Sequence, residues 1–318
     1  MDNICHTLVG AALAQTGLKK RTGLGAATLM IGANFPDIDA MAILIGRATE
    51  FRRGWTHGVL ALAVLPFALT ALMIAWDRYK RNSSEPGRRP VVPRELLLLS
   101  ALAILTHPTL DWMNSYGMRW LMPFDGRWFY GDSLFIIDPW LLIVLGLGVW
   151  LSRRRERGDA PRPWRPARVA IGVAVFYIAS MVGLQGVAER AARHELTGSA
   201  KANEGLFVFA SPADPIRWRV YGDDGDRYWR GTLSLTRTST GRLAFSNESI
   251  VKNANDPAAI AASRTERGQR FLNWARLPWY RIDRQLNSTR VEIVDARYGA
   301  RVEVTLAPEP EGRSAVPP

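Results

Sequence analysis

Histidine and aspartate side chains occur within or beside apolar segments in the first third of the chain, where an ionisable group is costly. The histidines are His6, His57 and His107, and the carboxylates are Asp37, Asp39 and Asp111. Imidazole and carboxylate are ligand types that suit zinc and related divalent metals. We therefore predict that these six residues bind one or more divalent metal ions, with zinc as the expected metal.

His107 and Asp111 are four residues apart, so they share one face if this segment is helical. The pair can then hold one metal ion or bridge two. The spacing is equally compatible with a histidine near a helix end and a carboxylate at the membrane interface.

Asp37 and Asp39 lie in the sequence Asn-Phe-Pro-Asp-Ile-Asp, at residues 34–39 of an otherwise apolar run. Pro36 breaks or kinks a helix, and broken helices in membranes are tolerated where they line a cavity. Both carboxylates could then reach the same site, and either could act as a general base. The alternative is that Asp37 only caps the second half of a broken helix.

The remaining candidates have ordinary explanations beside the functional ones. His57 follows Trp55 and could be an interfacial histidine, and His6 could be incidental to a chain end. Asn114 and Arg119 follow the His107/Asp111 face, and we predict that they contact the substrate. Arg119 could hold a phosphate or carboxylate or merely extend to the membrane interface. Asp138, directly before Pro139, is mainly a helix cap with a possible role in the pocket.

Apolar segments alternate with basic loops through residue 188. The candidate membrane segments are 5–18, 24–46, 58–76, 95–113, 137–151 and 168–188. Basic residues concentrate at 19–21, 78–94 and 153–168, and the positive-inside rule places these loops in the cytoplasm. The loop at 47–53 fits this orientation least well. The ionisable residues then gather at the outer leaflet, and the chain after residue 188 is extracytoplasmic.

Composition separates two regions and excludes several classes of protein. The net charge is +12, but much of it flanks apolar runs, which argues against nucleic-acid binding. The single cysteine excludes a disulfide framework and a multi-cysteine zinc site. After residue 200 apolar residues alternate with polar ones, as in 216–220 and 302–306, which is typical of antiparallel strands. We predict an α-helical multi-pass membrane domain at 1–190, a small antiparallel β-rich domain at 200–308 and a flexible tail at 309–318.

An ordered set of motifs resembles the YdjM/YbcI type of bacterial inner-membrane protein. The motifs are Met-Asp-Asn-Ile-Cys-His-Thr-Leu-Val-Gly, Asn-Phe-Pro-Asp-Ile-Asp, Arg-Gly-Trp-Thr-His-Gly, His-Pro-Thr-Leu-Asp-Trp-Met-Asn-Ser-Tyr-Gly and Phe-Ile-Ile-Asp-Pro. Residues 271–278 and 294–298 are similar to the C-terminal region of that family. Cys5 and Gly58 depart from the expected Thr and Ser, and neither change removes a proposed ligand. The resemblance implies a metal-dependent hydrolase of the inner (cytoplasmic) membrane and names no substrate.

A more distant likeness concerns zinc-dependent phospholipase C enzymes, which take histidine and aspartate ligands in the same chain order. It favours phosphoester chemistry. We expect a hydrolase that uses metal-activated water on a lipid or lipid-linked ester at the outer leaflet. A non-catalytic membrane module, with a structural metal or His/Asp network and a partner-binding outer domain, is the main alternative. An ion or proton transporter ranks last, because the inner halves of the segments are apolar. The number of metal ions and the oligomeric state are left open.

Overall fold

The computed structural model describes the chain except residues 46–50, 82–88, 198, 203, 237–242 and 308–318, so the expected tail at 309–318 lies outside the described residues. The chain divides into two compact units. The first contains Met1–Ala192, Val208–Arg219 and Leu233–Arg242. The second contains Arg193–Phe207, Val220–Thr232 and Leu243–Pro318.

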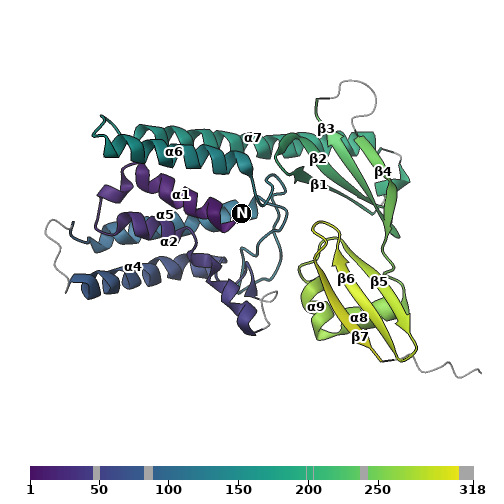
Figure 1. Cartoon of the computed structure of the whole chain (residues 1–318). Helices are drawn as coiled ribbons and strands as arrows, with labels where there is room; N and C mark the ends of the chain where they lie inside the picture. The colour runs from purple at the N-terminus through teal and green to yellow at the C-terminus, as the bar shows by residue number, and fades with distance from the viewer. Residues whose placement is uncertain (46–50, 82–88, 198, 203, 237–242, 308–318) are drawn as a thin grey trace, which may run out of the picture. The chain divides into compact units, whose positions relative to one another are not determined.

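The first unit is mainly helical (Figure 1). Its helices are α1 (Asn3–Gln15), α2 (Gly25–Gly32), α4 (Val59–Arg81), α5 (Pro93–Trp112), α6 (Pro139–Arg157) and α7 (Arg165–Glu195), the last extending three residues past Ala192. Two 3₁₀ segments, η1 (Leu18–Lys20) and η2 (Phe35–Ile45), lie between them. Aspartates start two of the helices: the carboxylate of Asp2 accepts hydrogen bonds from the N–H groups of Ile4 and Cys5, and that of Asp138 from Trp140 and Leu141. Both are ordinary N-cap geometry.

The candidate segment at 24–46 is interrupted, as Pro36 predicted. Helix α2 ends at Gly32, and η2 begins at Phe35, directly before Pro36. Proline lacks the N–H that would continue an α-helical ladder, which explains the interruption. Asp37 and Asp39 therefore lie on the 3₁₀ segment η2, directly after this interruption.

Close helix contacts form the interior of this unit. Gly10 on α1 faces the backbone of α2, because a Cβ there would lie 2.5 Å from the carbonyl oxygen of Leu29. Gly32 on α2 similarly faces Ala103 on α5. Buried apolar side chains fill the space among α2, α4 and α5, including Leu29, Leu69, Met73, Leu99 and Ile104. This packing fixes α5, which carries two of the candidate site residues.

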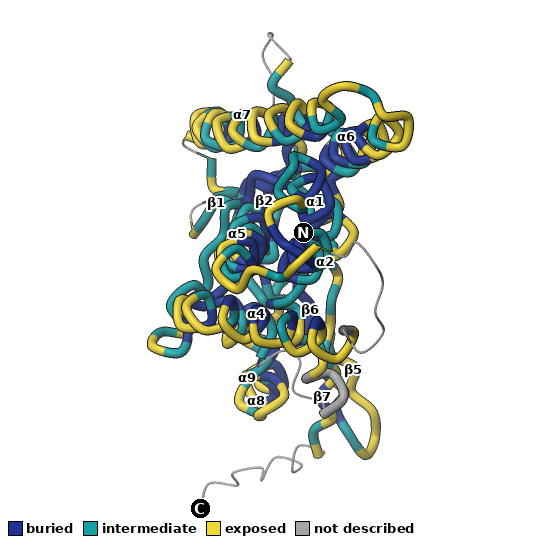
Figure 2. The backbone as a smooth tube through the Cα atoms, turned by 90° about the vertical axis from the view of Figure 1, so that its left-hand side faces the viewer, coloured by how far each residue is buried: buried dark blue, intermediate teal, exposed yellow. Residues whose placement is uncertain are grey.

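Two of the described helices are long and apolar enough to cross a membrane, judged by length and composition alone: residues Val59–Lys80 in α4 and Arg165–Glu195 in α7. Figure 2 shows long exposed stretches on both. Large apolar side chains are exposed there, among them Phe67 and Phe176. Such surfaces mark contact with a membrane or a partner.

The C-terminal part is rich in antiparallel strands, as the period-two pattern predicted. Strands β1 (Gly205–Ser211), β2 (Asp214–Asp223), β3 (Arg227–Ser234) and β4 (Leu243–Val251) form a sheet in that order, after the 3₁₀ segment η3 (Ala200–Ala202). Strands β5 (Pro278–Gln285), β6 (Ser288–Asp295) and β7 (Arg301–Leu306) form a second sheet, in which Ile282 pairs with Val291 and Val291 with Val304. Helices α8 (Pro257–Arg264) and α9 (Glu266–Leu272) precede it in the chain.

Candidate metal site

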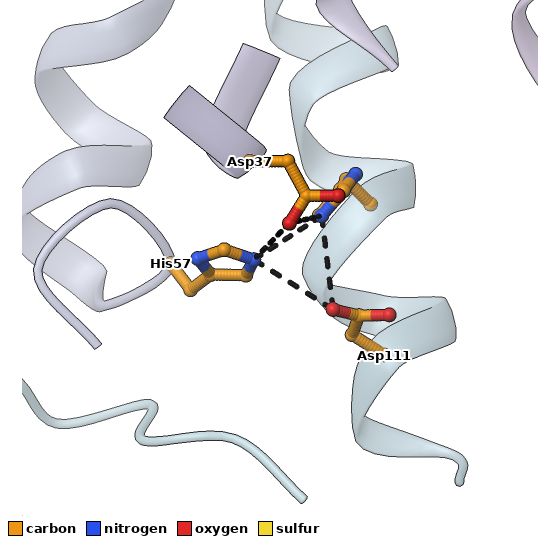
Figure 3. Close-up of side chains that lie close together, drawn as sticks. Asp37, His57 and Asp111 are labelled. Carbon is orange, nitrogen blue, oxygen red and sulfur yellow. Dashed lines mark hydrogen bonds and ion pairs between the residues drawn. The ribbon is translucent and has the colours of Figure 1, made fainter. Parts of the chain in front are cut away.

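Four of the predicted residues meet at one point in the first unit. Asp37 comes from η2, His57 from the loop before α4 and Asp111 from α5 (Figure 3). His107 lies on α5 as well. One potential ligand atom from each lies within 4.8 Å of the other three. His57 Nε2 is 3.1 Å from His107 Nε2 and 3.6 Å from Asp111 Oδ2, and His107 Nε2 is 3.6 Å from Asp37 Oδ1. The expected i,i+4 pair on α5 therefore does present both side chains to one site.

Hydrogen bonds on the far side of each imidazole fix which nitrogen faces the cluster. His107 Nδ1 lies 2.7 Å from the carbonyl oxygen of Ala33, which can only accept, so Nδ1 carries the hydrogen. His57 Nδ1 lies 2.9 Å from the Thr56 hydroxyl, which itself donates to Asp39. Both Nε2 atoms thus turn their lone pairs toward each other, an arrangement that a shared cation stabilises.

The surroundings of His57 favour positive charge on its imidazole. Burial acts against the charged form of His57, but hydrogen bonds with Asp111 and Asp39 raise its pKa above the ordinary histidine value. Two imidazole nitrogens and two carboxylate oxygens form a mixed donor set that fits zinc and other divalent transition metals.

Asp39 lies behind His57 rather than among these four ligand atoms. Its Oδ2 accepts hydrogen bonds from the N–H of Arg53 at 2.7 Å and from Thr56 at 3.1 Å, and is 3.3 Å from His57 Nδ1. This differs from the expectation that both carboxylates reach the same ion. Residues two apart on the η2 segment point to different sides of the imidazole. The position is that of an outer carboxylate that orients a metal-binding histidine.

His6 approaches the other oxygen of the Asp111 carboxylate. Its Nε2 is 3.3 Å from Asp111 Oδ1, and its ring stacks on His107 with centroids 3.8 Å apart. The amino group of Met1 also forms an ion pair with Oδ1. His6 Nδ1 is buried and has no hydrogen-bond partner among the described residues. His6 is therefore adjacent to the four-residue cluster, on the opposite side of Asp111.

Arg53 is a buried member of the site that the sequence analysis missed. Its guanidinium Nε and Nη2 lie 2.8 and 3.0 Å from the two Asp111 oxygens, and Nη1 donates to Asn114 Oδ1 at 3.1 Å. The guanidinium also lies over the Tyr116 ring at 4.4 Å. In the sequence analysis Arg53 belonged to the basic loop at 47–53, which fitted the predicted membrane orientation least well. Its position four residues before His57, within the motif Arg-Gly-Trp-Thr-His, was the sequence feature that could have indicated its role.

The three residues expected to contact a substrate are Asn114, Arg119 and Asp138, and each forms contacts within the protein. Asn114 Oδ1 accepts from Arg53 and from the N–H of Tyr116. Arg119 donates to the carbonyl oxygen of Arg52 at 3.0 Å and lies over the Trp128 ring. Asp138 caps α6 and accepts a hydrogen bond from the Tyr177 hydroxyl at 2.9 Å.

Comparison with known proteins places most of the helical region in one family. Residues 1–191 match the family described as YdjM inner membrane protein. The uncharacterized protein YfhP of Bacillus subtilis (strain 168) is 24% identical over 127 residues, which is 39% of this chain and 36% of that protein. The chain thus matches only about a third of the length of that relative. No solved structure matches the chain.

Proposed function

Because the chain belongs to the YdjM inner membrane protein family, we propose that it is an integral membrane hydrolase that uses a divalent metal ion at the Asp37/His57/His107/Asp111 cluster. The observation that carries this proposal is the pair of imidazole Nε2 atoms 3.1 Å apart, each fixed from behind by a hydrogen bond. Metal-binding histidines are oriented in this way.

The proposed substrate is a lipid or lipid-linked phosphoester at the outer leaflet. The candidate spans in α4 and α7 and their exposed apolar side chains support a membrane-embedded catalyst. The distribution of basic loops supports the proposed topology, with several further helices in the membrane and the β-rich region outside it.

Each cluster residue has a role in this proposal. A divalent metal held here would supply Lewis acidity toward the ester and toward water. His57 and His107 would bind it through Nε2, and the hydrogen bonds with Thr56 and Ala33 hold their rings in place. Asp37 has the most exposed side chain of the four, at 10%, and accepts the proton of the attacking water as general base.

A non-catalytic membrane module remains the second candidate, and one observation favours it. The side chains of His57, His107 and Asp111 are at most 1% exposed. A structural zinc site is closed in this way, whereas a catalytic one keeps an open position. In this alternative the metal only holds η2, the loop before α4 and α5 together.

Hydrolysis by the purified full chain distinguishes the two candidates. The protein, in detergent and loaded with Zn²⁺, is given bis-p-nitrophenyl phosphate and a phospholipid with a fluorescent headgroup. We expect hydrolysis of at least one probe, and a rate about 100-fold lower or less for Asp37→Asn, which keeps an oxygen donor but not a base. Metal binding without hydrolysis of either probe, or full activity in Asp37→Asn, would support the structural alternative.

A further inference from the structure

A cavity of about 300 Å³ lies among α1, α5, α6 and α7. All four helices contribute apolar side chains to its walls, including Val9, Leu13, Leu105, Leu145, Ile171 and Val175. Its volume is at the lower end of the range for ligand pockets. All of its lining residues belong to the first unit.

The polar residues in the lining do not make the cavity polar. The hydroxyl of Thr106 donates to the carbonyl oxygen of Ala103 at 2.7 Å, and that of Thr109 to Leu105 at 2.8 Å. Both hydroxyls are thereby satisfied within α5. The cavity is chemically suited to hydrocarbon and offers little to a polar ligand.

The walls of the cavity adjoin the metal cluster in the chain. Cys5, Thr106 and Leu110 line the cavity, and each directly precedes a residue of the cluster region: His6, His107 and Asp111, respectively. From Leu110 the lining continues along α5 to Leu102, which is about 12 Å at the rise of an α-helix. The cavity therefore extends from the turns that carry the cluster.

The cavity has an opening and a closed end. Leu105 and Val175 on its walls are 52% and 61% exposed, which places the opening between α5 and the candidate membrane span α7. Beyond Leu145 and Ile171, α6 and α7 come into direct contact, because a Cβ on Gly148 would lie 2.3 Å from that of Ala170. An ordinary lipid-facing surface has no such end.

We infer that this cavity holds one acyl chain of a bilayer phospholipid, with the ester of that lipid directed to the cluster; this assignment of the substrate class rests on the proposed function. The occupant follows from the continuity of the opening with the exposed apolar side chains of α7, a candidate membrane span in a chain of an inner-membrane protein family. The closed end implies a preferred chain length.

Photo-crosslinking tests the assignment without any need for catalysis. The full chain is reconstituted in nanodiscs that contain phosphatidylglycerol with a diazirine at the end of one acyl chain. Labelled peptides are mapped before and after substitution. We expect labels on the inner walls, at Val9 and Leu145, and a severalfold loss of these labels in Ala174→Leu, which fills the cavity. Val173→Leu is the matched control, since Val173 is exposed and does not line the cavity.

Label spread evenly over exposed residues such as Phe176, and unchanged in Ala174→Leu, would show annular lipid only and overturn the inference. If Ala174→Leu does not fold, Leu145→Ala decides: the enlarged cavity must admit a longer labelled chain, and failure to do so contradicts the assignment. Labelling inside the cavity without hydrolysis would retain this lipid site and defeat the proposed hydrolase. Hydrolysis of bis-p-nitrophenyl phosphate without cavity labelling would support the proposed hydrolase and overturn the lipid site.

Discussion

Asp111 in the first unit and Asp295 in the second are both buried carboxylates beside a buried arginine. Asp295 is fully buried and Asp111 is 1% exposed. Arg297 Nε lies 2.9 and 3.1 Å from the two Asp295 oxygens, much as Arg53 lies against Asp111. By burial and charge alone, either would count as a candidate functional residue.

Their other neighbours differ in kind. Asp295 also accepts hydrogen bonds from the N–H groups of Arg276, Leu277 and Arg297. All of these partners donate hydrogen bonds, so the Asp295 carboxylate joins backbone segments of the second unit and has a structural role. Asp111 faces the Nε2 atoms of His57 and His107, whose far nitrogens carry the hydrogens. Like Asp295, Asp111 has hydrogen-bond donors beside it, but a buried carboxylate indicates a metal site when imidazole nitrogens with free lone pairs also face it.

The largest expected effect is the loss of stability on removal of the Asp295 carboxylate. Asp295→Ala leaves Arg297 buried without its counter-ion, and we expect the second unit to lose about 3–5 kcal/mol of stability. Urea unfolding followed by far-ultraviolet circular dichroism measures this loss, with the exposed Asp283→Ala as the control. Zinc binding should not change. If Asp295→Ala lost zinc at a urea concentration where the chain is folded, the claim that Asp111 but not Asp295 belongs to the metal site would be contradicted.

Loss of a metal ligand should weaken zinc binding more than loss of a residue that only orients a ligand, which costs up to about 100-fold. We therefore expect a loss of more than about 100-fold, which corresponds to about 2.7 kcal/mol. His107→Ala removes one of the two facing Nε2 atoms. Competition with a chelator measures the affinity. The chain has four histidines, and His194→Ala, near the end of α7 and outside the cluster, is the matched control. Equal affinities in the two variants would refute the assignment of His107.

The smallest effect should come from the residues behind the ligands. Thr56→Val keeps the side-chain shape but removes the hydroxyl between His57 and Asp39, so we expect zinc affinity to fall about tenfold. Thr109→Val removes a hydroxyl that bonds only to its own helix at 2.8 Å and serves as the control. A change in Thr109→Val as large as that in Thr56→Val would show that the Asp39–Thr56 contact has no specific role.

Local periodicity accounts for what the sequence revealed of the site. The i,i+4 spacing of His107 and Asp111 depends only on α5 being helical, and Pro36 indicated the interruption that places Asp37. The separation of Asp37 from Asp39 could not be foreseen, because it depends on the orientation of η2 relative to His57. Arg53 was missed for a similar reason: burial of its guanidinium against Asp111 and Tyr116 is a tertiary contact with no periodic signature.

The helical and β-rich regions were also distinguishable from composition, because apolar runs and period-two alternation are local patterns. Trp218 and Val220 are indeed buried in β2, while Ile216 of the same expected pattern is 42% exposed. The interruption of the segment at 24–46 was also predicted, because the effect of Pro36 on a helix is local. Whether the whole set of segments crosses the membrane stays a prediction.

Anomalous X-ray scattering from crystals of the zinc-loaded protein tests the central claim most directly. We expect a zinc peak about 2.0–2.1 Å from Nε2 of both His57 and His107, beside the carboxylates of Asp37 and Asp111. A map with no zinc at this cluster, or with zinc only on other residues such as His194, would contradict the account.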